Sequence, residues 1–172
     1  ATGAEWTPEG NFVQVYLNGK YRGIYYLIEA IARGDGRIQV DDSGFIAEND
    51  AYWWNADGAY FKTSRQESSM GWTFKYPDLN EITTGQKDEI VNCIEAFEDS
   101  LYNNRPLDSI ADLHSFARWV LAHDYLGTKD AWGSNMYMYR QNLDPLHPET
   151  SKLKMATPWD FDSSFTTPDD EW

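Results

Sequence analysis

The hydrophobic pattern of the sequence changes its period near residue 83, and this change limits the folds open to the chain. Before it, short runs rich in aromatic and β-branched residues are separated by Gly, Asp and Asn, which is typical of β-strands. After it, apolar residues recur every three or four positions, which indicates helices. Two more short β-rich runs follow the helices. Strands, then two helices, then a small hairpin predict one α+β domain.

The first strands are predicted from the segment "NFVQVYLNGKYRGIYYLIEAI". Asn18-Gly19 separates two β-rich runs in it and is a strong hairpin signal. Gly23, inside the second run, predicts a bulge or a close backbone approach. Further strands are predicted for "GRIQVDD", "GFIAEND", "DGAYFKT" and "GWTFKYPD", the last of them ended by Pro77.

Two helices are predicted from apolar stripes and capping residues. The first spans residues 86–102 and begins at a capping box, Thr83–Gln86. The second spans about residues 109–126, with Ser109–Asp112 as its capping box and Gly127 as its C-terminal stop. The strands after them, "NMYMYRQ" and "KLKMATPW", are joined by a Pro-rich loop and predict a hairpin.

Charge and composition exclude several classes of function. The net charge is −14, which disfavours a nucleic-acid partner because the phosphate backbone needs a basic face. Acids gathered at one site would instead attract a divalent cation. No run reaches the ~18–20 apolar residues of a membrane span, so none is expected. Acyl-transfer chemistry has no support, because no Ser-His-Asp arrangement or G-x-S-x-G elbow is present.

Acids and an amide stand at the two ends of the last predicted hairpin. Asp130 precedes Asn135 by five positions, the spacing of the catalytic Asp and the metal-binding Asn in protein kinases. Beyond the hairpin, Asp160 and Asp162 stand where the kinase D-F-G triplet carries a second metal-binding Asp. Spacing alone leaves open that Asp130 caps a turn and that Asp160 ends a strand.

A site of this kind also needs a lysine for the phosphates, which kinases place on a strand and orient with a helical Glu. Lys75, at the end of a predicted strand, is the first candidate and Lys62 is the second. Each lysine also fits a solvated strand position. The first predicted helix offers Glu89, Glu95 and Glu98.

Five segments follow one another in an order shared with a known family. They are "VQVYLNGKYRGIYYLIEAI", "GRIQVDDSGFIAEND", "FKYPDLNEITTGQ", "DLHSFARWVLAHDYLGTKDAWGSNMYMYR" and "PWDFD". Together they resemble the CotH kinase-like family, named for spore coat protein H of spore-forming bacteria. The resemblance implies an atypical protein-kinase-like fold, with a β-rich N-terminal part followed by helices and a metal-site hairpin. It also implies a single domain over residues 1–172, shortened from a longer domain or protein.

The resemblance further implies transfer of phosphate from ATP, with Mg²⁺ or Mn²⁺, to Ser or Thr of a secreted, cell-surface or spore-coat protein. By motif, Asp130 corresponds to the catalytic Asp, and Asn135 and Asp160 correspond to metal ligands. Asp162 corresponds to a second ligand or a structural partner. Glu29 falls at a polar position of the family motif without an assigned role.

A second interpretation is a non-catalytic carbohydrate-binding or adhesion module that recognises a surface polysaccharide. Domains similar to this family also occur on cell-surface proteins, including those of polysaccharide degraders. Aromatic rings stack on sugar rings, and the candidates are Trp53, Trp54, Trp72 and Trp132. A measurement of nucleotide binding and a measurement of glycan binding would separate the two interpretations.

Overall fold

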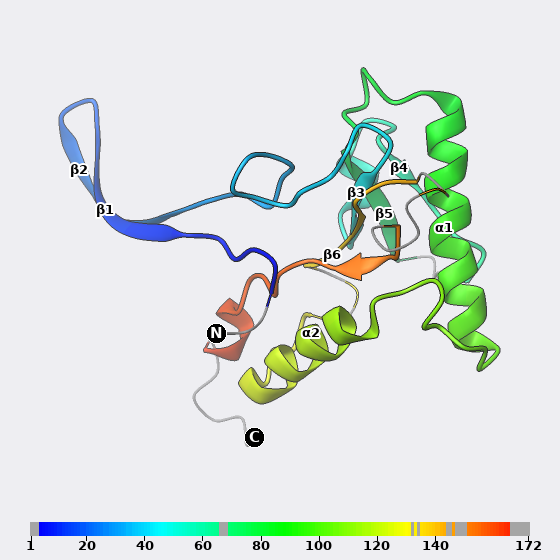
Figure 1. Cartoon of the computed structure of the whole chain (residues 1–172). Coiled ribbons are helices and arrows are strands. Elements are labelled where there is room, and N and C mark those ends of the chain that lie inside the picture. The colour runs from blue at the N-terminus through cyan, green and yellow to red at the C-terminus, as the bar shows by residue number, and fades with distance from the viewer. Residues whose placement is uncertain are drawn as a thin grey trace.

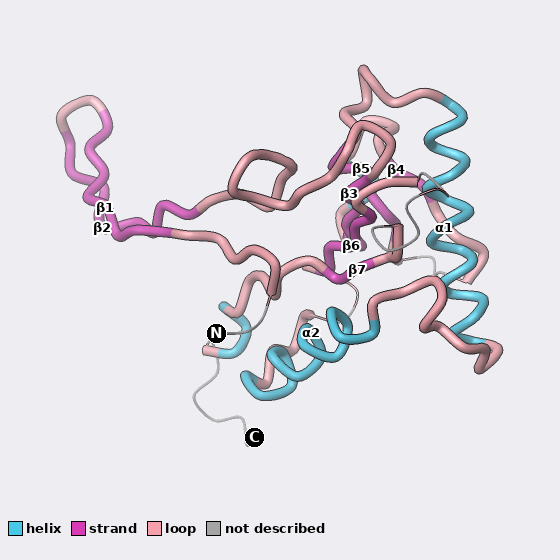
Figure 2. The backbone as a smooth tube through the Cα atoms, viewed as in Figure 1, coloured by secondary structure: helices cyan, strands magenta, loops and turns pink. Residues whose placement is uncertain are grey.

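The computed structural model describes residues 4–65, 69–131, 133, 135–143, 146 and 151–165. The described residues form two β-sheets and two α-helices (Figures 1 and 2), so the predicted α+β class is confirmed. Neither helix of this described part is long and apolar enough to cross a membrane. In chain order the elements are β1 (Gly10–Leu17), β2 (Lys20–Ile28), β3 (Phe45–Asp50), the 3-10 helix η1 (Trp53–Asn55), β4 (Tyr60–Phe61), β5 (Gly71–Tyr76), α1 (Thr84–Tyr102), α2 (Leu113–Leu126), β6 (Met136–Arg140), β7 (Lys154–Met155) and the 3-10 helix η2 (Asp162–Ser164).

The larger sheet is antiparallel, with the strand order β4-β5-β3-β6-β7. Its central strand, β3, is buried on both faces. The two helices and one face of the sheet enclose the main core, to which α1 contributes Ile90, Ile94 and Phe97 and α2 contributes Trp119. Because side chains alternate along a strand, Phe45 and Ala47 of β3 point to this core, and the residues between them point to the opposite face.

Both helices are confirmed, and the second begins later than predicted. The capping box Thr83–Gln86 is formed with both of its hydrogen bonds. The N-cap of α2 is Asp112, whose carboxylate accepts from the backbone N–H groups of the first turn. The prediction of Ser109 as the start is wrong, because the chain at Ala111 forms a β-bridge to the segment before β7 and stays extended there.

One predicted strand is absent from the described residues. In the segment "GRIQVDD" only Ile38 forms a β-bridge, an isolated one to Arg33, which precedes the segment. Ile38 and Val40 are nevertheless buried, against the sheet face that α1 leaves free. The alternation of apolar and polar residues in this segment therefore reflects the burial of Ile38 and Val40, although the backbone is not a strand. The other predicted strands are present, with β7 only two residues long.

The first two strands form a separate hairpin that projects away from the rest of the chain, at the left of Figure 1. Its turn is at Asn18-Gly19, as predicted, and Gly23, with φ 115°, stands at a bulge in the β1–β2 register. The apolar side chains are largely exposed, with Phe12 at 79 % and Ile24 at 66 %. Cross-strand pairs such as Phe12 on Tyr26, with ring centroids 5.0 Å apart, hold the hairpin together.

Candidate functional site

Asp130 lies in the short connection between α2 and β6. Gly127 ends α2 as predicted, in the left-handed conformation with φ 62°. Three residues on, Oδ1 of Asp130 accepts a hydrogen bond from Oγ of Ser163 at 2.6 Å. A second contact, between the hydroxyl groups of Thr128 and Ser164 at 3.0 Å, lies beside it. The connection is therefore tied to η2, which begins at the last residue of the Trp-Asp-Phe-Asp segment.

The carboxylates of Asp160 and Asp162 belong to the same cluster as Asp130. The pKa of Asp160 is raised, first by partial burial and then by the negative charge of Asp162, and Asp130 adds to the effect. The backbone N–H of Asp162 donates to the Asp160 carboxylate and opposes this shift in part. The structure thus brings acids from the two ends of the β6–β7 hairpin near one another. Asp130, Asp160 and Asp162 are called the acid cluster below.

Two of the predicted metal ligands have an uncommon backbone conformation. Asn135, half-buried just before β6, has φ 56°, and Asp160 has φ 58°. Only a few per cent of residues other than glycine adopt this left-handed region, although Asn and Asp do so more readily than others. Such conformations gather at active sites and ligand clamps. Whether Asn135, Asp160 and Asp162 bind a metal stays a prediction.

The residues present fit a hard cation that brings water and phosphate oxygens as further ligands. Mg²⁺ is commonly held by one or two carboxylates together with substrate phosphates, whereas a protein cage supplies most ligands of other cations. Asp160 and Asp162 offer two carboxylates side by side. Within the described residues, no group of three or more His, Cys, Asp or Glu is arranged so that it could hold a metal ion by itself. A cation here would relieve the repulsion that raises the Asp160 pKa.

Lys75 lies on the sheet face opposite α1. Its ammonium group forms an ion pair with Glu48 of β3, Nζ to Oε2 2.6 Å, and the Glu48 side chain is only 11 % exposed. The neighbours of Lys75 on β5, Trp72 and Phe74, point to the main core. The partner of Lys75 is therefore a strand carboxylate, because strand alternation turns the lysine away from the helix that carries Glu89, Glu95 and Glu98.

Tyr137 of β6 connects the Lys75–Glu48 pair to the acid cluster. Its pKa is raised, first by burial and then by the charge of Glu48, with which its hydroxyl forms a hydrogen bond. Asp50 and Asp160 are close enough to raise it further. Lys75, Tyr137 and Asp160 thus lie on one side of the sheet.

Two other residues singled out in the sequence lie elsewhere. The ammonium group of Lys62 sits over the ring of Trp53, 4.5 Å from its centroid, next to η1. Glu29 lies at the base of the β1–β2 hairpin, where its carboxylate accepts from the backbone N–H of Glu9 at 3.1 Å. The contacts of Glu29 with Glu9 close the base of the hairpin. Of the two lysines, Lys75 is the better placed for the acid cluster.

The tryptophans that were predicted to stack on sugar rings differ in how exposed they are. Trp72 is 2 % exposed and packs in the core between the sheet and α1, so its prediction is wrong. The side chain points inward because β5 alternates in register with β3. Trp54 of η1 is 62 % exposed, and the neighbouring Trp53 packs against Tyr60. Trp132 lies outside the described residues.

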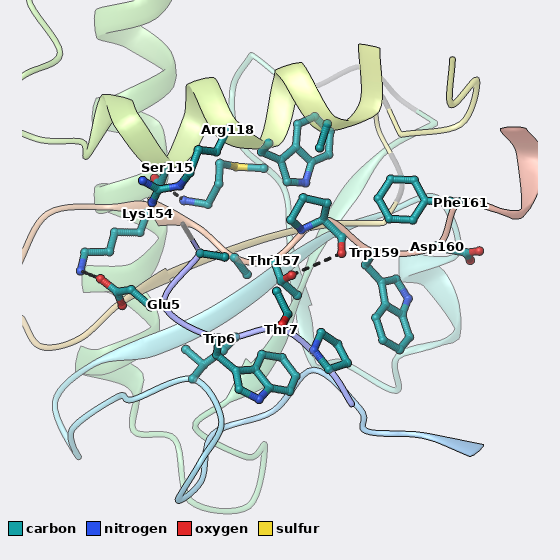
Figure 3. Close-up of a pocket in the computed structure, with 18 of the residues that line it drawn as sticks. Glu5, Trp6, Thr7, Ser115, Arg118, Lys154, Thr157, Trp159, Asp160 and Phe161 are labelled. Atoms are coloured by element: carbon teal, nitrogen blue, oxygen red, sulfur yellow. Dashed lines mark hydrogen bonds and ion pairs between the residues drawn. The ribbon is translucent and has the colours of Figure 1, made fainter. Parts of the chain in front are cut away.

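A cavity of about 770 Å³ adjoins the acid cluster, and the sequence did not indicate it. Figure 3 shows the Glu5–Lys154 ion pair at one end and Asp160 at the other, with its carboxylate directed outward. The volume is typical of small-molecule sites. The walls come from the N-terminal segment, α2 and the chain from β7 to Phe161, together with Ile28, Ile38 and Tyr139. The aromatic residues among them are Trp6, Trp119, Tyr125, Tyr139, Trp159 and Phe161.

His123 of α2 lies beneath the acid cluster and was also missed. It is 1 % exposed, and its ring packs between Trp119, at 4.2 Å, and Phe161, at 4.9 Å between centroids. Neither ring nitrogen has a hydrogen-bond partner among the described residues. Burial lowers the pKa of His123, while the charge of Asp130 opposes that shift. His123 is therefore a neutral side chain that packs against Phe161 of the Trp-Asp-Phe-Asp segment.

Replacing His123 with Phe should reduce the pH dependence of stability. A histidine whose folded pKa is lowered stays neutral in the fold while the unfolded chain takes up a proton, so stability falls as the pH drops below about 6.5. At neutral pH, His123→Phe should be within about 1 kcal/mol of the wild type, because no hydrogen bond is lost. Urea unfolding at pH 7.5, 6.5 and 5.5 measures both effects.

The matched control for this prediction is His114→Gln on the same helix, since His114 is exposed. It should keep the wild-type pH dependence. Equal slopes of the free energy of unfolding against pH in the wild type and His123→Phe would contradict the prediction.

A protein-family model described as CotH kinase protein matches residues 5–171. Searches of curated proteins and of solved structures each gave no match. The family match extends over nearly the entire sequence and includes both ends of the acid-bearing hairpin. The chain belongs to the CotH kinase family.

Proposed function

We propose that this chain is an atypical protein kinase domain of kinase-like fold, which transfers the γ-phosphoryl group of ATP to Ser or Thr of another protein. The observation that carries the proposal is the convergence of Asp130 with Asp160 and Asp162, from segments about 30 residues apart in the sequence. Family membership supports the kinase-like assignment. The acceptor is a secreted, cell-surface or spore-coat protein.

Each part of the site has a role in this proposal. Asp130 accepts the proton of the acceptor hydroxyl, and Lys75 contacts the phosphates. Asp160 and Asp162, with Asn135, hold Mg²⁺ or Mn²⁺. The bound metal neutralises charge on the phosphates. The aromatic walls of the adjoining cavity offer a place for the adenine base.

Thermal unfolding with ATP and MgCl₂ or MnCl₂ tests the nucleotide site. A ligand at about 100 times its dissociation constant adds about 2.7 kcal/mol to the free energy of unfolding. For a chain of this size, that raises the melting temperature by about 5–11 °C. Asp160→Asn should abolish this shift, because it removes a metal-binding carboxylate.

The matched control is Asp57→Asn. Asp57 also has a left-handed backbone, with φ 45°, but lies in the turn after η1. It should keep the wild-type shift. No shift in the wild type, or an equal shift in Asp160→Asn, would remove the nucleotide-binding assignment. The same titration with Lys75→Met and Lys62→Met identifies the phosphate-binding lysine, and we expect a weaker shift only for Lys75→Met.

A second candidate function is carbohydrate binding, and one observation favours it. Tyr52, which precedes η1, is 67 % exposed, and Trp54 of η1 is 62 % exposed. Such rings suit stacking on sugars. A glycan array with the wild type and Trp54→Ala tests this candidate. Retention on no glycan, or equal retention of both proteins, would exclude Trp54 as a sugar platform.

A further inference from the structure

Asp130 accepts a hydrogen bond from a hydroxyl group of its own chain. Oγ of Ser163 donates to Oδ1 of Asp130 at 2.6 Å, the length of a hydrogen bond between a hydroxyl and a carboxylate. The backbone N–H of Lys129 donates to the same Oγ at 3.3 Å and holds it in place. A general base must lie about 2.6–3.2 Å from the atom whose proton it takes. Ser163 meets this condition toward Asp130.

We propose that Ser163 is a phosphoacceptor of this chain's own active site, so that the domain phosphorylates itself there. The inference rests on the proposed function and adds to it a specific modification site. Ser163 directly follows Asp162 and is three residues from Asp160. The hydroxyl group is therefore held by the proposed base and stands beside the carboxylates proposed to bring the phosphates in.

The neighbouring hydroxyl groups do not share this arrangement. Oγ of Ser164 contacts Oγ1 of Thr128 at 3.0 Å, and no hydrogen bond to Asp130 is recorded for either within the described residues. Ser163 and Ser164 are both half-buried and both belong to η2. The two residues differ in their hydrogen-bond partners, which are Asp130 for Ser163 and Thr128 for Ser164. Ser164 is thus a control matched in residue type, burial and local structure.

The step balances with ATP as the only co-reactant. Oγ of Ser163 attacks the γ-phosphorus, and the new O–P bond forms as the bond to the β,γ-bridging oxygen breaks. ADP leaves with that electron pair. The proton of the Ser163 hydroxyl passes to the Asp130 carboxylate and then to solvent. The products are ADP, a phosphoserine and one proton.

Phosphorylation changes the charge of the site itself. A phosphoserine carries about −1.5 to −2 charges at neutral pH and would stand next to Asp130, Asp160 and Asp162. Repulsion from these acids expels the modified side chain, so its hydrogen bond to Asp130 is lost. Asp130 is then open to the hydroxyl group of another protein.

The test compares the full chain as wild type, Ser163→Ala, Ser164→Ala and Asp130→Asn, each incubated with ATP and MnCl₂. We expect one phosphoryl group per chain in the wild type and in Ser164→Ala, and peptide mapping should place it on Ser163. Ser163→Ala should take up none, and Asp130→Asn should take up phosphate at least about 10²-fold more slowly than the wild type. The rate constant of this uptake should not change on dilution, because a reaction within one chain is first order in protein.

Two further measurements separate this inference from a structural role and from the proposed function. In the metal-free protein, amide hydrogen exchange at Lys129 should be faster in Ser163→Ala and unchanged in Ser164→Ala, since Lys129 loses its acceptor only in the first. Ser163→Ala should phosphorylate a basic Ser-containing peptide no more slowly than the wild type. A tenfold slower rate would make Ser163 a positioning residue and overturn the inference.

The remaining outcomes are also decisive. If the wild type phosphorylates the peptide but carries no phosphate on Ser163, the inference fails and the proposed function stands. If ATP produces no thermal shift and neither the peptide nor the chain is phosphorylated, the proposed function fails and the inference fails with it.

Discussion

Replacing Asp130 with Asn should lower the rate of phosphoryl transfer by about 10²–10⁴-fold, the usual contribution of a positioned general base. The amide cannot take up the proton of an acceptor hydroxyl at neutral pH. Its carbonyl oxygen can still accept the hydrogen bond that Ser163 donates, so the connection between α2 and β6 should keep its structure. Initial rates with a basic Ser-containing peptide at saturating ATP and MnCl₂ measure the loss.

ATP binding should respond differently. Asp130→Asn should keep the thermal shift with ATP and metal, whereas Asp160→Asn should lose it, because Asp160 is a proposed metal ligand and Asp130 is not. A rate within a few-fold of the wild type in Asp130→Asn would exclude Asp130 as the base. Loss of the thermal shift in Asp130→Asn would instead assign Asp130 to the metal site.

Local sequence signals predicted the elements whose geometry is set locally. The hairpin turn at Asn18-Gly19 and the capping box Thr83–Gln86 each involve groups only a few residues apart, and both are present. The signals were less reliable where distant contacts decide. Ser109 resembles a cap by spacing, yet the bridge from Ala111 to the chain before β7 moves the helix start to Asp112. Nothing near Ser109 in the sequence reports that bridge.

The candidate site was also predicted only in part, because some of its contacts join segments that are far apart in the sequence. The sequence indicated that a hairpin would bring Asp130 toward Asp160, and the two lie in one cluster. It did not indicate that Glu48 would pair with Lys75. That pairing depends on the register of β3 with β5 and on a bulge in it, which no single segment encodes. The cavity was missed because its walls come from several parts of the chain that are far apart in the sequence.

Trp119 connects this cavity to the core, so its removal should have the largest effect on stability. The side chain is 2 % exposed, belongs to the main core and packs on His123. Truncation of a buried Trp to Ala typically costs about 3–5 kcal/mol through lost burial and the space left behind. In a chain of this size, Trp119→Ala should therefore lower the melting temperature by about 6–20 °C.

The control lies two turns away on the same helix. Tyr125 of α2 is 84 % exposed, and Tyr125→Ala should change the free energy of unfolding by no more than about 0.5 kcal/mol. Urea unfolding of both variants measures the difference between an inward and an outward aromatic residue of α2. A loss below about 1 kcal/mol in Trp119→Ala would contradict the packing of α2 on the sheet. That packing also supports Phe161 through His123, so Trp119→Ala should weaken ATP binding even though Trp119 lies outside the acid cluster.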